Sequence, residues 1–440
     1  MTRFQLPGES SALAGISLLL MILWSILSEA VPVVPSWPSG LFGWLAAVLL
    51  ITHLSRVQLL QIGVLVAVGI ITLSIGIWLG TKPHWLRLLD GNASLLSMLA
   101  AVSFLRLVAM QNNQDIEEAP RGMHSYWQTM LAVALFGAFI NLSAPILIAD
   151  RVSGGKRLNI FAAKSITRAF IGGPTWSPFF AGMAVVLTYV ADAHYLSIMA
   201  FGLPFALVGL MVVVSEARLR FPDEVQNFRG YPMTRASLLL PGILVGGVLI
   251  AHFLLPHVSI LAVISLTAIS VSAFGLFLSR GFTEAKQQLQ EHILTGLPKM
   301  VNELVLFLGA GVLALGLQTL VSAGHLSLSF TQVYDGTTAT ILLGAMILVA
   351  VLGVHPVISI AVATPLIAPL NPHPQLLALT FVFSWSLGAC ASPLSGLNLI
   401  FQGRYAIPSA KLAVANWPYV LTMYPIAALF LYGAAALLDI

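Results

Sequence analysis

Residues 172–178 read GGPTWSP, and residues 387–393 read LGACASP. Both stretches hold a glycine, three further residues and a Ser-Pro pair, at Gly173, Ser177, Pro178 and at Gly388, Ser392, Pro393. Each lies inside a long apolar segment, and proline breaks a helix about where it sits. Broken backbone at membrane depth persists only where protein or a water-filled cavity satisfies its polar groups. The two motifs therefore predict two interrupted membrane helices with a site beside them.

The composition around these motifs is that of a membrane protein. Of 440 residues, 58% are apolar and 8% are charged, whereas a soluble domain carries roughly 25% charged residues. A soluble protein is excluded. A bilayer core about 30 Å thick needs about 20 apolar residues of helix. The sequence predicts an all-α polytopic protein with eleven crossings, near 12–31, 41–55, 58–80, 95–110, 160–191, 195–215, 236–252, 258–278, 299–321, 375–402 and 416–438.

Two further apolar segments, 126–152 and 337–370, are interrupted by proline, at Pro145 in the first and at Pro356, Pro365 and Pro369 in the second. We interpret both as re-entrant hairpins. With a cytoplasmic amino terminus, fifteen Lys and Arg residues fall in inside loops, against Lys82 and Arg87 outside. This bias follows the positive-inside rule and places the carboxyl terminus in the periplasm.

The motifs, with the segments upstream of them, also predict an internal repeat. Ser143-Ala144-Pro145 and His355-Pro356 stand near the two hairpin tips, at similar distances before the breaks. Each half has five crossings, an odd number, so the second half enters from the opposite side. A chance similarity of a few residues is the alternative. The predicted organisation is an anchor at 1–40, a first repeat at 41–217, a cytoplasmic linker at 218–235 and a second, inverted repeat at 236–440.

This plan resembles the ion transporter superfamily, and within it the divalent anion/sodium symporters. Members of that family carry Ser-Asn-Thr at each hairpin tip and a Gly/Thr/Pro-rich break that ends in Asn. The second break matches through Gly388, Ser392, Pro393, Gly396 and Asn398, and the first matches more loosely through Gly172, Gly173, Thr175, Ser177 and Pro178. The tips depart from the pattern, because only Ser143 keeps a hydroxyl and His355-Pro356 replaces the second motif. The resemblance implies an elevator-type secondary transporter, commonly a homodimer.

The breaks can bind ions without charged side chains. Helix ends carry about half an elementary charge, so freed amides suit an anion, while freed carbonyls and hydroxyls suit sodium. Serine or threonine in a membrane helix can instead bond to its own backbone. Arg168 could draw an anion inward or pair with a carboxylate, and His355 could titrate or serve as a structural histidine. The predicted substrate-binding residues are Ser143, Pro145, Arg168, Thr175, Ser177, His355, Ser392 and Asn398, and the predicted ion-coupling residues are Ser143, Gly173, Ser177, His355, Gly388 and Ser392.

The predicted function is secondary active transport of a small anion, such as an organic carboxylate, coupled to sodium or protons. An exporter of weak acids or drugs, or a cation/proton antiporter, would use the same fold. A channel or a membrane-embedded enzyme belongs to another class, and no catalytic pair, metal cluster or phosphate-binding loop is evident in the sequence. The expected partners are the lipid bilayer and the anion, with no nucleic acid and no cofactor beyond the coupling ion. The short loops favour a bacterial inner membrane.

Overall fold

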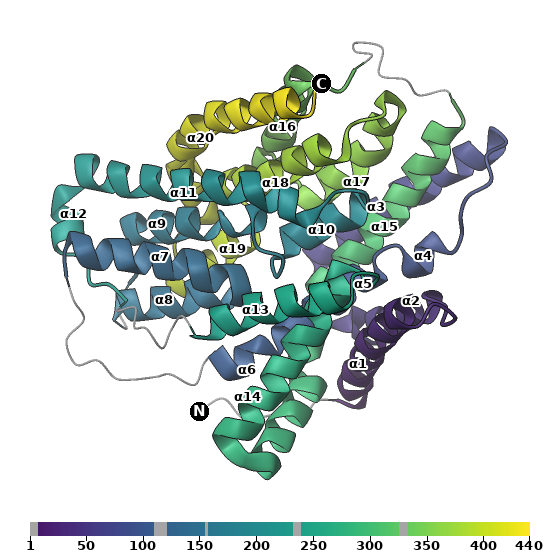
Figure 1. The fold of residues 1–440 in the computed structure, drawn as a ribbon, viewed down its shortest axis with the longest axis horizontal. Coiled ribbons are helices and arrows are strands. Elements are labelled where there is room, and N and C mark those ends of the chain that lie inside the picture. The colour runs from purple at the N-terminus through teal and green to yellow at the C-terminus, as the bar shows by residue number, and fades with distance from the viewer. Residues whose placement is uncertain (1–7, 110–120, 155–156, 232–238, 325–332) are drawn as a thin grey trace. The chain divides into compact units, whose positions relative to one another are not determined.

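The structure, a computed structural model, describes residues 8–109, 121–154, 157–231, 239–324 and 333–440 (Figure 1). Within these ranges every regular element is a helix. Among the described residues, seven helical runs are long and apolar enough to cross a membrane: Glu9–Ala30, Gln58–Trp78, Arg87–Val108, Tyr195–Arg220, Ile260–Ser322, Pro374–Tyr405 and Ser409–Leu437. Shorter apolar helices occupy Trp37–His53, Leu239–Leu254, Gly336–Val351 and Pro356–Leu370. The protein is therefore an all-helical membrane protein, and the count of eleven crossings stays a prediction.

The chain divides into two compact units that alternate along the sequence. Unit 1 is drawn from residues 1–112 and 242–327, and unit 2 from residues 113–241 and 328–440. Each predicted repeat thus gives its first spans to unit 1 and its predicted hairpin, broken span and final span to unit 2. All sequence-predicted site residues lie in unit 2.

Unit 1 contains α1 (Glu9–Ala30), α2 (Trp37–Leu50), α3 (Arg56–Trp78), α4 (Arg87–Asp90), α5 (Ala93–Ser103), α6 (Leu105–Ala109), most of α13 (Leu239–Leu254), α14 (Ile260–Glu291) and α15 (Val301–Ser322). Helices α3 and α15 pack closely because glycines face each other. A Cβ on Gly69 would lie 2.8 Å from the Val312 backbone, and one on Gly316 would lie 2.2 Å from Gly69 O. Small residues of this kind allow membrane helices to approach backbone to backbone.

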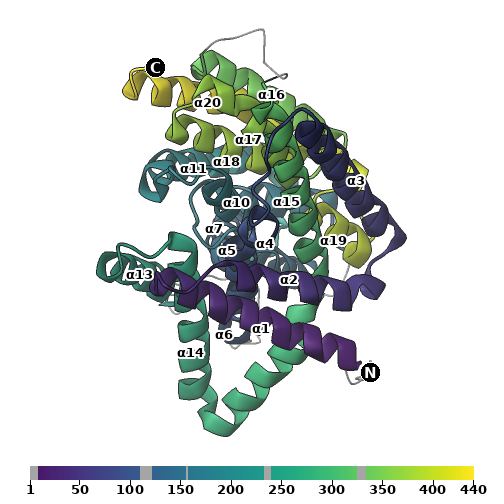
Figure 2. The same cartoon turned by 90° about the vertical axis from the view of Figure 1, so that its right-hand side faces the viewer.

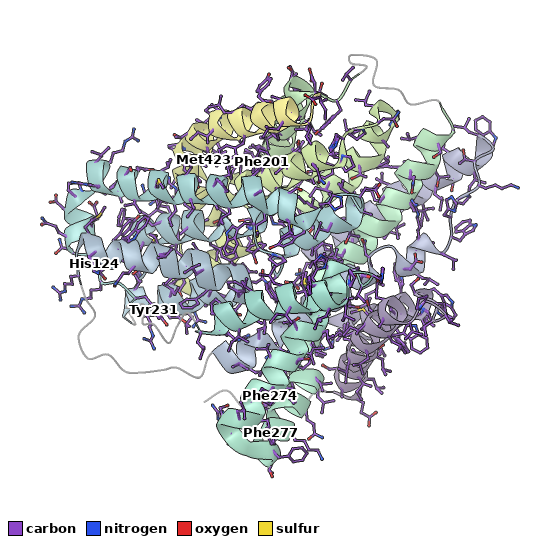
Figure 3. All side chains as sticks on the ribbon, viewed as in Figure 1. His124, Phe201, Tyr231, Phe274, Phe277 and Met423 are labelled. Carbon is purple, nitrogen blue, oxygen red and sulfur yellow. The ribbon has the colours of Figure 1, made fainter. Side chains whose placement is uncertain are left out.

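Helix α14 bends at Gly281, whose φ of +76° is in the left-handed region (Figure 2). Glycine adopts this conformation without steric cost. Before the bend, the side chains of Phe274 and Phe277 project outward from α14, with exposed fractions of 64% and 47% (Figure 3). Large exposed apolar side chains on an apolar helix are suited to contact with lipid.

Unit 2 begins with α7 (Met123–Ile140), α8 (Ser143–Ser153), α9 (Ile160–Phe170), α10 (Ala181–Tyr189), α11 (Tyr195–Arg220) and α12 (Pro222–Gln226). It ends with α16 (Gly336–Val351), α17 (Pro356–Ile367), α18 (Pro374–Ala391), α19 (Gly396–Tyr405) and α20 (Ser409–Leu437). Helix α9 packs against both α7 and α11, as Figure 1 shows, and α18 packs against α16 and α20.

Local capping explains where several helices of unit 2 begin. Asn159 Oδ1 accepts the Ala162 N–H at 2.7 Å and starts α9. Asp335, ahead of the apolar stretch, accepts the Thr338 N–H at 2.8 Å and starts α16. This bond from the Thr338 amide holds the pKa of the Asp335 carboxyl below its usual range. Side-chain caps of this type satisfy amides that have no partner within the helix.

The turn of each helical hairpin lies just ahead of the first proline of its segment, Pro145 or Pro356. Helices α7 and α8 are joined at Asn141-Leu142, where Asn141 has a φ of 49°. Helices α16 and α17 are joined by residues 352–355, with Gly353 at a φ of 95°. Pro365 lies inside α17 and does not end it. The expectation that each proline breaks its helix is thus wrong for Pro365.

Candidate functional site

The two Ser-Pro motifs form the same local structure. The Ser177 N–H donates to Gly173 O at 2.9 Å, and the Ser392 N–H donates to Gly388 O at 2.9 Å. Each serine hydroxyl then accepts an N–H two residues later, from Phe179 at 3.3 Å and from Leu394 at 3.2 Å. The first turn follows a short 3-10 helix, Gly173–Thr175, that comes after α9, whereas the second turn directly ends α18 at Ala391, and the next helices begin at Ala181 and Gly396. A Gly-x-x-x-Ser-Pro sequence therefore encodes one hydrogen-bonded turn, which is used twice.

The first hairpin is fastened to the first break. Ser177 Oγ donates to Ala138 O of α7 at 2.5 Å, and Asn141 Nδ2 at the tip donates to Phe179 O at 3.1 Å. The Phe139 ring lies 5.3 Å from the Phe179 ring, centroid to centroid. Ser143 begins α8 and is half-buried, whereas Pro145 is buried on the same helix.

The second hairpin contacts α18 and the second break. The ring centroids of His355 and Trp385 are 5.4 Å apart in an edge-to-face arrangement. A Cβ on Gly353 would lie 2.8 Å from Leu394 Cδ1, and one on Gly388 would lie 3.0 Å from Ala350 Cβ of α16. The glycine of this break is thus needed for close approach of the hairpin.

Contacts also cross between the two halves. A Cβ on Gly396 at the second break would lie 3.6 Å from Leu142 Cδ1 at the first tip. Ser386 Oγ of α18 donates to Ile171 O, at the start of the first break, at 2.6 Å. The first tip thus approaches the second break, and α18 bonds to the start of the first break, within unit 2. A solute site between the tips and the breaks stays a prediction.

Most polar side chains near the first break serve the backbone. Thr175 Oγ1 donates to Gly172 O and to Gly202 O at 2.8 and 2.9 Å, and the Ser177 hydroxyl both donates and accepts. The second break differs. Asn398 Nδ2 donates to Ser392 O at 2.8 Å, but Asn398 Oδ1 and Ser395 Oγ are buried and have no partner among the described residues. Both oxygens lie at the start of α19, since Ser395 directly precedes this helix and Asn398 stands in its first turn.

His355 acts as a helix cap. Its Nδ1 accepts the Val357 N–H at 3.3 Å at the start of α17, and His373 accepts the Gln375 N–H at 3.3 Å at the start of α18. Both histidines precede a proline at the first helical position. An Nδ1 that accepts an amide carries no proton, so this bond favours the neutral ring of His355.

Arg168 of α9 is held in a buried ion pair. Its guanidinium donates to Glu216 Oε2 of α11 at 2.5 Å, to Asn416 Oδ1 of α20 at 3.0 Å and to Ala415 O at 2.7 Å. Lys164 shares the same glutamate at 3.2 Å. Of the two predicted roles of Arg168, the structure shows the pairing with a carboxylate. Its role in substrate binding stays a prediction.

Sequence reasoning missed Glu216, Asn416 and Asn141. Glu216 stands between apolar residues and Arg218 in the last turns of a long helix, a position typical of an interfacial charge. Its basic partners lie 48 and 52 residues away. Asn141 did carry a signal, since asparagine is enriched where a turn requires positive φ.

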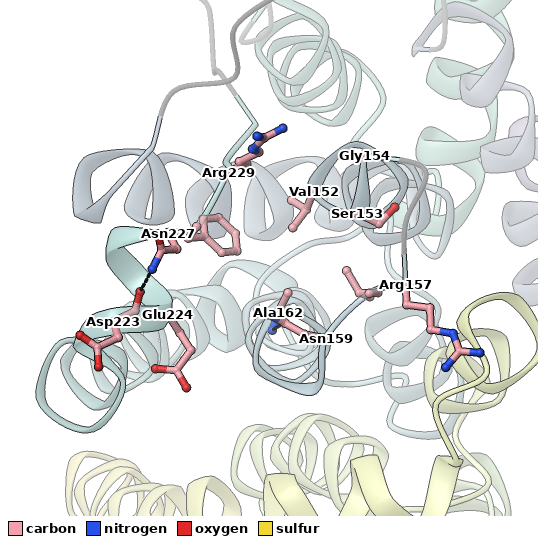
Figure 4. Close-up of a pocket in the computed structure, with 12 residues that line it drawn as sticks. Val152, Ser153, Gly154, Arg157, Asn159, Ala162, Asp223, Glu224, Asn227 and Arg229 are labelled. Atoms are coloured by element: carbon pink, nitrogen blue, oxygen red, sulfur yellow. Dashed lines mark hydrogen bonds between the residues drawn. The ribbon is translucent and has the colours of Figure 1, made fainter.

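A separate cavity of about 530 Å³ lies at the opposite ends of α8 and α9 from the tip and the break. Figure 4 shows Arg157 and Arg229 on its wall, with Asp223 and Glu224 on α12. Asn159 and Ala162 line it at the start of α9. Its charges are balanced and none of the predicted site residues reaches it. Among the described residues, no three His, Cys, Asp or Glu side chains gather as a metal site requires.

Comparison with solved structures shows similar folds. The fold resembles the crystal structure of the YdaH transporter of Alcanivorax borkumensis, which was described as having an unusual topology, with a TM-score of 0.56 and 14% sequence identity. The match covers 84% of this chain and 97% of that one. No protein-family model and no curated protein matches the chain. The chain therefore has a transporter-like helical membrane fold, and its resemblance to the divalent anion/sodium symporters stays a prediction.

Proposed function

We propose that this protein is a secondary active transporter that moves a small anion, such as an organic carboxylate, by sodium-coupled, elevator-type alternating access. Unit 2 carries the solute between its two hairpin tips and two breaks, and unit 1 is the scaffold. The observation that carries the proposal is the shared turn at Ser177 and Ser392, placed beside two helical hairpins in one unit. Broken helices paired in this way are typical of secondary transporters. The fold similarity to a protein described as a transporter supports the same class.

Four helix N-termini supply the attraction for an anion. Helices α8 and α17 begin at the hairpin tips, and α10 and α19 begin after the breaks. Each N-terminus carries about half a positive charge, although the Val357 amide of α17 is already bonded to His355 Nδ1. An anion can therefore be held without an arginine at the site, which agrees with the pairing of Arg168 to Glu216.

Sodium is the better candidate for the coupling ion. Asn398 Oδ1 and Ser395 Oγ are buried without a partner in the part of the chain that the structure describes, just after α18 ends at Ala391. Oxygens of this kind coordinate sodium in broken-helix transporters. Proton coupling through His355 is disfavoured, because a proton on Nδ1 would displace the bond from the Val357 amide.

Uptake into proteoliposomes tests the coupling. We expect uptake to saturate with sodium at fixed pH and with no pH gradient. Ser395→Ala should raise the sodium concentration for half-maximal uptake without lowering thermal stability, because that hydroxyl bonds to none of the described residues. Ser265→Ala is the matched control, since the Ser265 hydroxyl bonds only to Leu261 O of its own helix. Uptake that ignores sodium and follows a pH gradient would overturn the sodium assignment.

The proposal also includes an inverted repeat, a cytoplasmic amino terminus, a periplasmic carboxyl terminus in a bacterial inner membrane, and a homodimer. Cysteine labelling from either side of the membrane tests the orientation, with residues 82 and 404 expected on opposite faces. Counterflow from loaded vesicles tests direction. Exchange driven by an outward substrate gradient identifies an exporter instead.

A further inference from the structure

Unit 2 contains a buried cluster with one excess positive charge. Lys164 and Arg168 of α9 share the single carboxylate of Glu216, at 3.2 and 2.5 Å, with side chains 10%, 2% and 15% exposed. Two cations on one anion leave a net charge of +1 away from water. A buried charge is costly unless it is paired.

The surroundings offer only partial compensation. Lys164 Nζ lies 3.7 Å from the Phe221 ring centroid, and the Arg168 guanidinium lies 5.3 Å from that of Tyr419. Arg168 also donates to Ala415 O. Rings and carbonyls attract a cation, but they carry no net charge. The excess charge therefore remains.

An unused donor points into the same place. Asn416 is fully buried, and its Oδ1 accepts the Arg168 Nε–H at 3.0 Å. This bond fixes the orientation of the amide, so the other atom is the NH₂ group. Asn416 Nδ2 has no partner among the described residues. This buried donor lies beside an excess positive charge, and an acceptor from outside the chain would satisfy it.

Packing alone does not require an arginine here. Arg168 stands nine positions ahead of Ser177, and Phe383 stands nine positions ahead of Ser392. Phe383 packs against Phe205 of α11 and Phe430 of α20, with centroid distances of 4.3 and 6.3 Å. The same two helices surround Arg168. An aromatic ring thus fills the corresponding position of the other half, and the charge of Arg168 serves something other than the fold.

We propose that Arg168 and Asn416 form a binding site for one small monovalent anion, a halide or a carboxylate. The anion would accept from Asn416 Nδ2 and neutralise the cluster. Complete burial of the two side chains restricts the ligand to a small one. Arg168 lies in the last turn of α9, which ends at Phe170. The proposal assigns the ligand to Asn416 Nδ2 and not to the serines of the two breaks, so its test does not require transport.

The test is thermal unfolding of the purified full-length protein in detergent, at constant sodium and ionic strength, with gluconate replaced by chloride or acetate. We expect a saturable rise in Tm with one or both small anions. Asn416→Ala should abolish that rise, while the exposed control Asn227→Ala keeps it. A larger rise in Tm with chloride identifies the ligand as a halide, and a larger rise with acetate identifies it as a carboxylate. No rise with either anion, or an equal rise in Asn416→Ala, would overturn the proposal.

Bromide offers a direct readout that does not rely on stability. An anomalous bromide peak within hydrogen-bond distance of Asn416 Nδ2 is expected in crystals, and no such peak in Asn416→Ala crystals. Since neither experiment measures uptake, failure of the anion site leaves the transport proposal standing. Failure of sodium-driven uptake likewise leaves the anion site standing.

Discussion

The hydroxyl of Ser386 donates a 2.6 Å hydrogen bond to the carbonyl oxygen of Ile171. Each residue stands six positions ahead of a break serine, Ser392 and Ser177 respectively. Corresponding positions of two copies touch each other where a two-fold axis passes between them. This contact, and the equal turns at the breaks, support the proposed inverted repeat with its axis beside α18.

A second pair of bonds agrees with that relationship. Tyr126 Oη donates to Ser165 Oγ at 2.8 Å, and Tyr334 Oη donates to Thr380 Oγ1 at 2.9 Å. Both acceptors stand twelve positions ahead of their break serine. The hydroxyl that accepts the tyrosine bond therefore occurs at the same position of the broken span in each half.

Removal of the shared counter-ion should destabilise unit 2. Glu216→Gln leaves Lys164 and Arg168 buried without a carboxylate, and breaking a buried pair costs about 3 kcal/mol or more. The midpoint of chemical unfolding in detergent measures the loss. Glu224→Gln, on the exposed surface of α12, should be neutral. Equal effects of the two substitutions would contradict the assigned ion pair.

Close packing of α11 on the first break should make Gly202 intolerant of any side chain. A Cβ on Gly202 would lie 1.7 Å from Thr175 O. Backbone must shift, at a cost of about 3 kcal/mol or more. Gly433→Ala is the matched control, because nothing lies within 4 Å of a Cβ there and alanine favours a helix by up to about 1 kcal/mol. Size-exclusion profiles and Tm compare the two, and a stable Gly202→Ala protein would disprove the contact.

Replacement of His355, the cap of α17, by asparagine should leave transport intact. Asn is a good helix cap, so His355→Asn keeps α17 in place while removing a titratable ring. We expect sodium-driven uptake with an unchanged pH profile, as for His373→Asn at the equivalent cap of α18. A His355→Asn protein that folds but no longer responds to pH would show that this ring carries the coupling proton.

The first hairpin, formed by α7 and α8, should move together with α19, the helix that follows the second break. Arg404 of α19 donates to both Asp150 oxygens of α8 at 2.8 and 2.6 Å, and Tyr405 Oη adds a bond of 2.6 Å. We expect a short cross-linker between Asp150→Cys and Arg404→Cys to leave uptake within about twofold, because both lie in one rigid body. Cys390, the one cysteine of the sequence, is replaced by alanine. Uptake that stops on cross-linking would contradict an elevator, and each single cysteine variant is the control.

The helices and both breaks could be predicted because their signals are local. Apolar length marks a membrane helix, and Gly-x-x-x-Ser-Pro marks a turn whose bonds span only a few residues, as at Gly173 and Ser177. The state of individual polar groups could not be predicted. Ser177 and Thr175 bond to α7 and α11 through tertiary contacts, whereas Asn398 Oδ1 has no partner within the described ranges. Nothing in the motif separates these outcomes.

The partners of the buried charges could not be predicted from the sequence either. Arg168 could be recognised as an intramembrane cation, but its partners Glu216 and Asn416 come from helices distant in sequence. Their selection depends on how α9, α11 and α20 pack. The same packing places Phe205 and Phe430 around Phe383, so the sequence pattern of an apolar helix does not reveal which of its neighbours is polar.

The interleaving of the two units also sets an order for biosynthesis. Arg168 reaches its hydrogen-bond partner Asn416 across 248 residues. At about 5–20 residues per second, ribosomes need roughly 12–50 s to make that interval. During this time Arg168 lacks its two partners on α20, Asn416 and the carbonyl oxygen of Ala415. Unit 2 can be completed only after α20 has been inserted. Truncation before α20 should therefore lead to degradation of the whole protein, and the first half should not function by itself.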